Sequence, residues 1–167
     1  MIRKCLIALA LLCLPLIAHA GDDPEHARLA ALSGGWTVKQ SLWLGGATTP
    51  KVDSGHADYA MVLGHHLQQN LTIDDGTDFH GLGTIGFDNA AGHYFSTWMD
   101  TNFPGLVVAW GDYDAASKSY TFTGSMDGGK VPVREVMTIT DARHFTYDYY
   151  ESHDGKEALT VRLEYSR

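Results

Sequence analysis

From Trp36 to its end, the sequence repeats one pattern, in which a short run of alternating apolar and polar residues is followed by turn-forming residues. Alternation with a period of two is typical of a β-strand with one buried face. Separators such as Asp74-Asp75-Gly76, Asp127-Gly128-Gly129 and Asp154-Gly155 contain the residues that tight turns require. About ten short strands at this spacing predict an all-β fold, either an antiparallel barrel or a flattened sandwich.

The predicted strands are Trp36–Leu44, Ala57–Leu63, His66–Ile73, Phe79–Phe87, His93–Met99, Leu106–Tyr113, Ser119–Ser125, Val131–Thr140, His144–Glu151 and Ala158–Tyr165. One short helix is predicted before them, over Pro24–Leu32. Asp22 or Asp23 can cap this helix, Pro24 suits its first turn, and Gly34 follows its end.

Alternation also predicts which residues of each strand face the interior. The inward sets with the clearest apolar character are Trp36, Val38 and Leu42; Leu67, Leu71 and Ile73; Leu106, Val108 and Trp110; Phe145, Tyr147 and Tyr149; and Leu159, Val161, Leu163 and Tyr165. A barrel of this size is either filled by its own side chains or holds one small ligand. Both alternatives stay open at this point.

The first twenty residues have the layout of a secretory signal peptide. Arg3 and Lys4 precede an apolar run from Leu6 to Ile17, and Ala18-His19-Ala20 offers small residues for cleavage before Gly21. We therefore predict a signal peptide over residues 1–20, a single domain over residues 21–167, and a periplasmic or secreted protein without a membrane anchor after cleavage.

Cleavage would change both the cysteine content and the charge. Cys5 and Cys13 both lie in the predicted signal, so a thiolate zinc site and a cysteine nucleophile are excluded from residues 21–167. Loss of Arg3 and Lys4 leaves ten basic against twenty acidic residues, a net charge of −10 with histidine counted as neutral. Such a surface repels phosphate backbones and anionic lipids, so no nucleic-acid partner is expected.

Several motifs resemble one family along nearly the whole of residues 21–167. They are Leu32-Ser33-Gly34-Gly35-Trp36, Leu63-Gly64, Leu67-Gln68-Gln69, Gly81-Leu82-Gly83, Asp88-Asn89, Ser96-Thr97-Trp98-Met99-Asp100, Gly111-Asp112-Tyr113-Asp114, Thr121-Phe122-Thr123-Gly124 and Val133-Arg134-Glu135-Val136. Together they resemble the DUF1579 family of uncharacterised bacterial proteins. The resemblance implies a lipocalin-like, calycin-type barrel and says little about activity. His65-His66 departs from the family pattern, in which an arginine and an aromatic residue are more usual.

Glu135 is the most unusual candidate for function, because it interrupts a strand rich in valine, methionine and isoleucine. It shares the presumed inward side with Val133, Met137 and Ile139. Burial there would raise the pKa of its carboxyl group unless a cation or hydrogen-bond donors stabilise the charged form. The group could bind the polar head of a ligand, act as a general acid or base, or belong to a buried hydrogen-bond network.

We therefore expect the barrel to bind an apolar or amphipathic small molecule. The predicted ligand-binding residues are Trp36, Gln69, Trp98, Trp110, Glu135, Tyr147 and Tyr149. The first alternative is an enzyme that uses Glu135 as acid or base in the same cavity. The second is a haem-binding barrel similar to nitrobindins, with His66, His80 or His144 as the axial ligand. No other cofactor and no metal site is predicted, and a filled barrel that acts through its surface also remains open.

Overall fold

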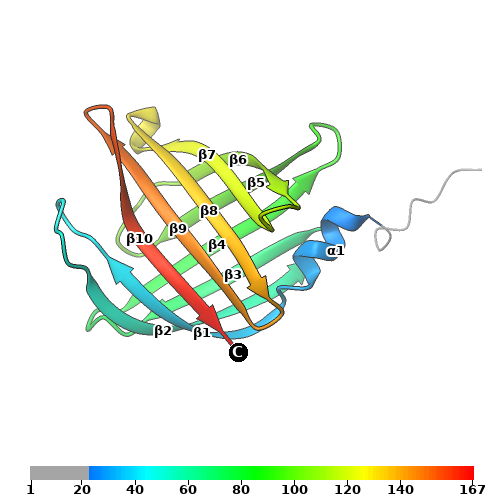
Figure 1. Ribbon diagram of the computed structural model, residues 1–167, viewed down its shortest axis with the longest axis horizontal. Helices are drawn as coiled ribbons and strands as arrows, with labels where there is room; N and C mark the ends of the chain where they lie inside the picture. Colours follow the sequence, from blue (N-terminus) through cyan, green and yellow to red (C-terminus); the bar gives the residue numbers. More distant parts are fainter. Residues whose placement is uncertain (1–22) are drawn as a thin grey trace, which may run out of the picture.

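The computed structural model describes residues 23–167, which form a closed antiparallel barrel of ten strands with one short helix (Figure 1). The elements are α1 (Pro24–Ala30), β1 (Gly34–Leu42), β2 (Lys51–Val62), β3 (His66–Ile73), β4 (Phe79–Asp88), β5 (His93–Asp100), β6 (Val107–Asp114), β7 (Ser119–Met126), the 3₁₀ turn η1 (Asp127–Gly129), β8 (Val131–Asp141), β9 (His144–His153) and β10 (Lys156–Ser166). The predicted all-β barrel is confirmed, and the sandwich alternative is wrong. The predicted signal peptide lies outside the described residues.

The strands follow one another around the barrel in chain order, and β1 closes it by pairing with β10. Val38 lies opposite Tyr165 and Gln40 opposite Leu163 across this seam. Closure gives each of the ten strands two neighbours, so within residues 23–167 the barrel has no open sheet edge. Within residues 23–167, no helix has the length and apolar character needed to cross a bilayer.

Helix α1 lies at the end of the barrel where β1 begins and β10 finishes, which we call the helix end (Figure 1). The Asp23 side chain caps α1 by accepting a hydrogen bond from the Glu25 amide at 2.9 Å, and Pro24 occupies the first turn. The opposite end carries the β1–β2, β3–β4, β5–β6, β7–β8 and β9–β10 connections, and we call it the far end.

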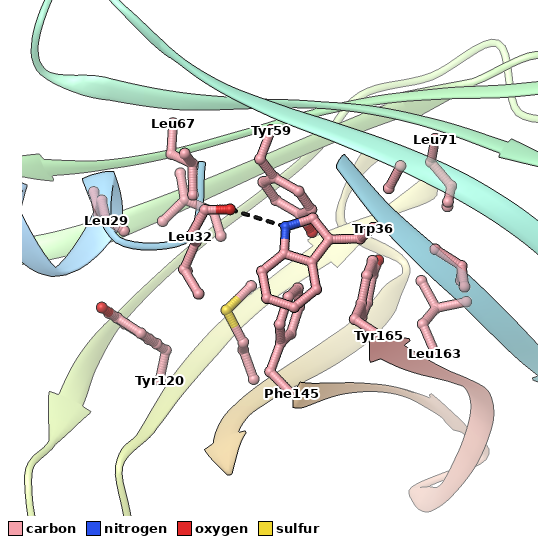
Figure 2. Packing of buried hydrophobic residues seen from close by; sticks show 14 of the residues in the cluster. Leu29, Leu32, Trp36, Tyr59, Leu67, Leu71, Tyr120, Phe145, Leu163 and Tyr165 are labelled. Carbon is pink, nitrogen blue, oxygen red and sulfur yellow. Dashed lines mark hydrogen bonds between the residues drawn. The ribbon is translucent and has the colours of Figure 1, made fainter. Parts of the chain in front are cut away.

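A cluster of aromatic residues fills the core at the helix end. Trp36 is buried there, and its indole nitrogen donates a hydrogen bond to the Leu32 carbonyl at 2.9 Å (Figure 2). Phe145 packs edge-on against Trp36 with ring centroids 4.7 Å apart and stacks on Tyr165 at 4.1 Å. Leu29 brings an apolar side chain from α1 into the same cluster. Side chains of α1, β1, β9 and β10 therefore form one apolar cluster at the helix end.

The predicted inward faces are confirmed for most strands, but they are wrong in two places. In β6, which begins at Val107, the inward residues are Val107 and Ala109, and both are buried. Trp110 lies on the outer face with 46% of its surface exposed. In β10 the register shifts between Leu159 and Val161. The bulge moves Leu159 out of the inward set, because a bulge adds one residue to a strand of period two.

Candidate functional site

Glu135 lies on the inner wall of β8 and is completely buried, with 0% of its surface exposed. Among the described residues, neither carboxyl oxygen has a hydrogen-bond partner. Burial raises the pKa of Glu135, and the nearby hydroxyl groups of Ser96 and Tyr147 offset only part of that rise. A buried carboxyl group whose oxygens lack hydrogen bonds lowers the stability of the native protein, so packing alone does not explain a glutamate at this position.

Two tyrosines of β9 flank Glu135. Tyr149 lies directly opposite it in the β8–β9 ladder, and Tyr147 is the next inward residue toward the helix end. Burial raises the pKa of Tyr147 well above its usual value, and the Glu135 carboxyl raises it further. The Tyr149 hydroxyl donates to the Met126 sulfur at 3.3 Å. Both rings therefore stay neutral and give Glu135 an aromatic, weakly polar surrounding.

Three carboxyl groups gather around Tyr149. Burial raises the pKa of its hydroxyl, and Glu151, Glu135 and Asp100 each raise that pKa further through their negative charge. Asp100 comes from the end of β5 and Glu151 from β9, so the far half of the barrel interior is acidic. Glu151 accepts a hydrogen bond from the exposed His153 ring at 2.8 Å.

Trp98 forms the wall on the other side of the interior. Its ring lies over Gly81 and Gly83, and a Cβ at Gly81 would collide with the indole. The indole nitrogen donates to Asp100 Oδ2 at 2.7 Å. Asp100 Oδ1 accepts from the amides of the next loop, Asn102 at 2.8 Å and Phe103 at 2.9 Å. Trp98 and Asp100 thus hold each other and the β5–β6 loop in place.

We call Trp98, Asp100, Glu135, Tyr147, Tyr149 and Glu151 the lumen site. It contains four of the residues predicted from the sequence: Trp98, Glu135, Tyr147 and Tyr149. The pattern also offered a signal for Asp100 and Glu151, because each is two residues beyond an inward aromatic on the same strand. Neither was predicted as a site residue, nor was Ser96, which lies next to Glu135.

The structure separates three predicted residues from this site. Trp36 belongs to the core at the helix end. Gln69 faces inward, and its amide nitrogen donates to the Tyr165 hydroxyl at 2.8 Å. Trp110 points outward, so its predicted place inside the barrel is wrong. It borders a surface hollow of about 470 Å³, in which His93 Nδ1 and Asp112 Oδ1 pair at 2.7 Å in contact with solvent.

A second surface hollow, of about 380 Å³, is lined by residues of β1, β8, β9 and β10, and it too has none of the lumen-site residues in its lining. Access to water distinguishes these two hollows from the lumen site. The polar groups of the hollows can be satisfied by water, whereas the Glu135 carboxyl has no exposed surface. We therefore take the lumen site as the candidate functional site.

The histidines considered as haem ligands do not face the lumen. His66 packs against Phe95 on the outer face of the barrel, at a ring distance of 5.7 Å. His80 and His144 are more than half exposed and pair with Asp78 and Asp141. A haem inside the barrel would need an axial ligand that projects into the interior, and none of these three side chains does so.

The fold resembles redesigned β-barrels among solved structures. One redesigned barrel is 16% identical, with 83% of this chain and 93% of that chain covered and a TM-score of 0.43. The redesigned barrel mFAP0 bound to DFHBI is 14% identical, with 82% and 99% covered and a TM-score of 0.41. EF1p2_mFAP2b bound to DFHBI is also 14% identical, with 86% and 97% covered and a TM-score of 0.41.

A comparison with curated proteins gave no significant match. The family comparison matched residues 22–167 to the model of DUF1579, which is described as a protein of unknown function. The match takes in all ten strands and the helix, as the sequence motifs indicated. The chain belongs to the DUF1579 family.

Proposed function

We propose that this protein binds a small amphipathic molecule in the far half of its barrel, at the lumen site. The observation that carries the proposal is the Glu135 carboxyl, which is fully buried on the inner wall and has no hydrogen-bond partner among the described residues. A polar ligand group at this position would provide the missing partner. The aromatic faces of Trp98, Tyr147 and Tyr149 would contact the apolar body of the ligand.

Binding is favoured over catalysis because the neighbouring carboxyl groups are already engaged. General acid–base chemistry by paired carboxyls needs a second group that is free to exchange a proton. Asp100 accepts three hydrogen bonds, from Trp98, Asn102 and Phe103. Glu151 is bonded to His153. Of the three carboxyl groups, Glu135 is the one for which neither oxygen has a hydrogen-bond partner among the described residues, which suits the recognition of one polar group.

We further propose that the protein acts in the periplasm or outside the cell. This rests on the basic start, the apolar run and the small residues around Ala20, the pattern that directs a chain to export. Export would place the barrel where small molecules from the surroundings reach it directly.

Native mass spectrometry of the full chain, produced with its own N-terminus and extracted gently, tests both parts. The expected spectrum has the polypeptide mass of residues 21–167 plus a stoichiometric small-molecule mass, and Glu135→Gln lowers the occupied fraction. Glu164→Gln is the matched control, since Glu164 lies on the outer face and pairs with Lys39. A bare polypeptide mass, even after incubation with a lipid extract, would contradict binding, and an uncut chain would contradict export.

A further inference from the structure

The lumen site is acidic and has almost no basic partner. Glu135 lies opposite Tyr149 in the β8–β9 ladder, Glu151 is the next residue on the same face of β9, and Asp100 comes from the end of β5 beside Trp98, so that all three carboxyl groups affect the Tyr149 hydroxyl. Within residues 23–167, the only basic side chain in ionic contact with any of the three is His153, which pairs with Glu151 and is mostly exposed. Three buried or half-buried carboxyl groups that lie near one another favour a positively charged guest and disfavour a negative one.

The Glu135 carboxyl gives independent evidence that a donor belongs here. It is the deepest of the three and its exposed fraction is zero; the Ser96 and Tyr147 hydroxyls lie nearby, but no hydrogen bond of good geometry reaches either oxygen among the described residues. Removing a carboxylate from water costs several kcal/mol unless donors or an opposite charge replace the water. A group that brings both a charge and N–H donors would replace it best.

The aromatic walls fit the same kind of guest. Trp98 lies over Gly81 and Gly83, and Tyr149 and Tyr147 line the side of β9 next to Glu135. The faces of such rings attract cations, with tryptophan the strongest of the three aromatic types. The rings also contact an apolar body well, so one molecule with a cationic head and an apolar body satisfies both parts of the site.

A metal ion fits this arrangement less well. Among the described residues, no group of three or more histidine, cysteine, aspartate or glutamate side chains converges closely enough to hold one ion. Asp100 is also turned toward its own loop and the Trp98 indole. Separate carboxyl groups attract one ammonium through their summed charge without each contacting it, whereas a metal ion needs several oxygen ligands in direct contact.

We propose that the lumen site recognises the protonated amine of an amphipathic molecule, with Glu135 as the acceptor of the ammonium N–H groups. The proposal rests on the proposed binding function and names the class of ligand. A quaternary ammonium would satisfy the rings but not the free oxygens of Glu135, so a primary amine is the better fit. Alcohols lack the charge, and carboxylates would be repelled by Asp100 and Glu151.

Isothermal titration calorimetry with four probes of one apolar body tests this at neutral pH. The probes are 4-phenylbutylammonium, its N-trimethyl analogue, 4-phenylbutan-1-ol and 4-phenylbutanoate. We expect the primary ammonium to bind at least about tenfold more tightly than the alcohol, and the carboxylate to bind weakest, because charge-assisted hydrogen bonds are stronger than neutral ones. Glu135→Gln should lower the ammonium affinity about tenfold or more and change the alcohol affinity little, while Glu164→Gln should change neither.

The outcomes separate the two proposals. If the alcohol or the carboxylate binds as tightly as the primary ammonium, a binding barrel stands and recognition of an amine is wrong. Tighter binding of the N-trimethyl probe would overturn the role of Glu135 as acceptor of N–H groups. Displacement of the ammonium by calcium ions at stoichiometric concentration would reassign the site to a metal. If no probe binds and native mass spectrometry finds no added mass, the binding function itself fails.

Discussion

At the scale of single residues, Glu135 determines how this barrel responds to pH. The native protein holds the Glu135 proton more tightly than the unfolded chain does, because burial raises the pKa from an ordinary value of 4.5. Its contribution to stability is therefore complete below about pH 4.5 and is lost as the pH rises through the native-state pKa. At neutral pH the fold either keeps the proton on Glu135 or contains a buried charge.

Replacing Glu135 with glutamine should remove this dependence. We expect the free energy of unfolding of Glu135→Gln to match that of the unmodified protein near pH 4 and to exceed it increasingly toward pH 8. The gain at pH 8 should be about 1.4 kcal/mol for each pH unit by which the pKa of Glu135 in the native protein exceeds that in the unfolded chain. Urea denaturation at several pH values, without added ligand, measures it.

Glu164→Gln is the matched control for this experiment, because it makes the same chemical change on the outer face. Glu164 is exposed and forms an ion pair with Lys39 at 2.7 Å. Exposed pairs contribute up to about 1 kcal/mol, so the effect of this variant should stay small at each pH. A constant difference between Glu135→Gln and the unmodified protein from pH 4 to pH 8 would contradict a raised pKa at Glu135.

At the scale of elements, the C-terminal residue connects segments that are distant in the sequence. The Arg167 guanidinium lies over the Trp36 ring at 4.1 Å from its centroid. It also donates to the carbonyl oxygens of Ser33 at 2.7 Å, Ala31 at 3.2 Å and Ala142 at 2.9 Å. One side chain therefore connects β10, the α1–β1 connection and the β8–β9 turn at the helix end.

Arg167→Ala should lower the free energy of unfolding by about 1–3 kcal/mol, because several charge-assisted hydrogen bonds and a cation–π contact are lost together. Lys39→Ala is the comparison, since it removes a basic side chain that forms only an exposed ion pair and should cost at most about 1 kcal/mol. Chemical denaturation of the two variants measures the difference. Equal losses would mean that Arg167 does not hold the helix end together.

The elements also show how far the sequence determines the structure. Alternation and turn residues predicted every strand, and the strand over His66–Ile73 has the predicted bounds. Strand β2 begins at Lys51, six residues before the predicted start at Ala57. The prediction missed Lys51 to His56 because this stretch contains polar residues and a glycine and shows little apolar alternation. The face of Leu159 was missed because a bulge depends on pairing with β9, which is a property of the sheet and not of the strand.

Part of the candidate site was predictable from the same alternation of apolar and polar residues. Glu135 stood out because a carboxyl group within an apolar alternation marks an unusual inward residue. Asp100 and Glu151 lie at strand ends, where polar residues are ordinary, so their shared position near Tyr149 became evident only from the closed barrel. Trp110 was misplaced because both alternating sets in this stretch are apolar, Leu106, Val108 and Trp110 on one face and Val107 and Ala109 on the other, so alternation alone gave no inward side.

At the scale of the whole molecule, the two ends of the barrel differ in packing. The helix end contains the buried residues Leu29, Trp36, Phe145 and Tyr165, and α1 covers it. The far end contains half-buried aromatic residues, carboxyl groups and longer connections such as the one over residues 43–50. Local opening costs less where fewer apolar side chains are buried, so the far end should open first and admit a ligand.

Amide hydrogen exchange followed by NMR tests this asymmetry, and strand β9 contains its own control. Phe145 and Glu151 each pair with a residue on both neighbouring strands, so a missing ladder partner does not distinguish them. We expect the Phe145 amide, at the helix end, to exchange at least about tenfold more slowly than that of Glu151, which corresponds to about 1.4 kcal/mol in opening free energy. Equal protection would contradict entry at the far end, because both ends would then open only when the barrel unfolds as a whole.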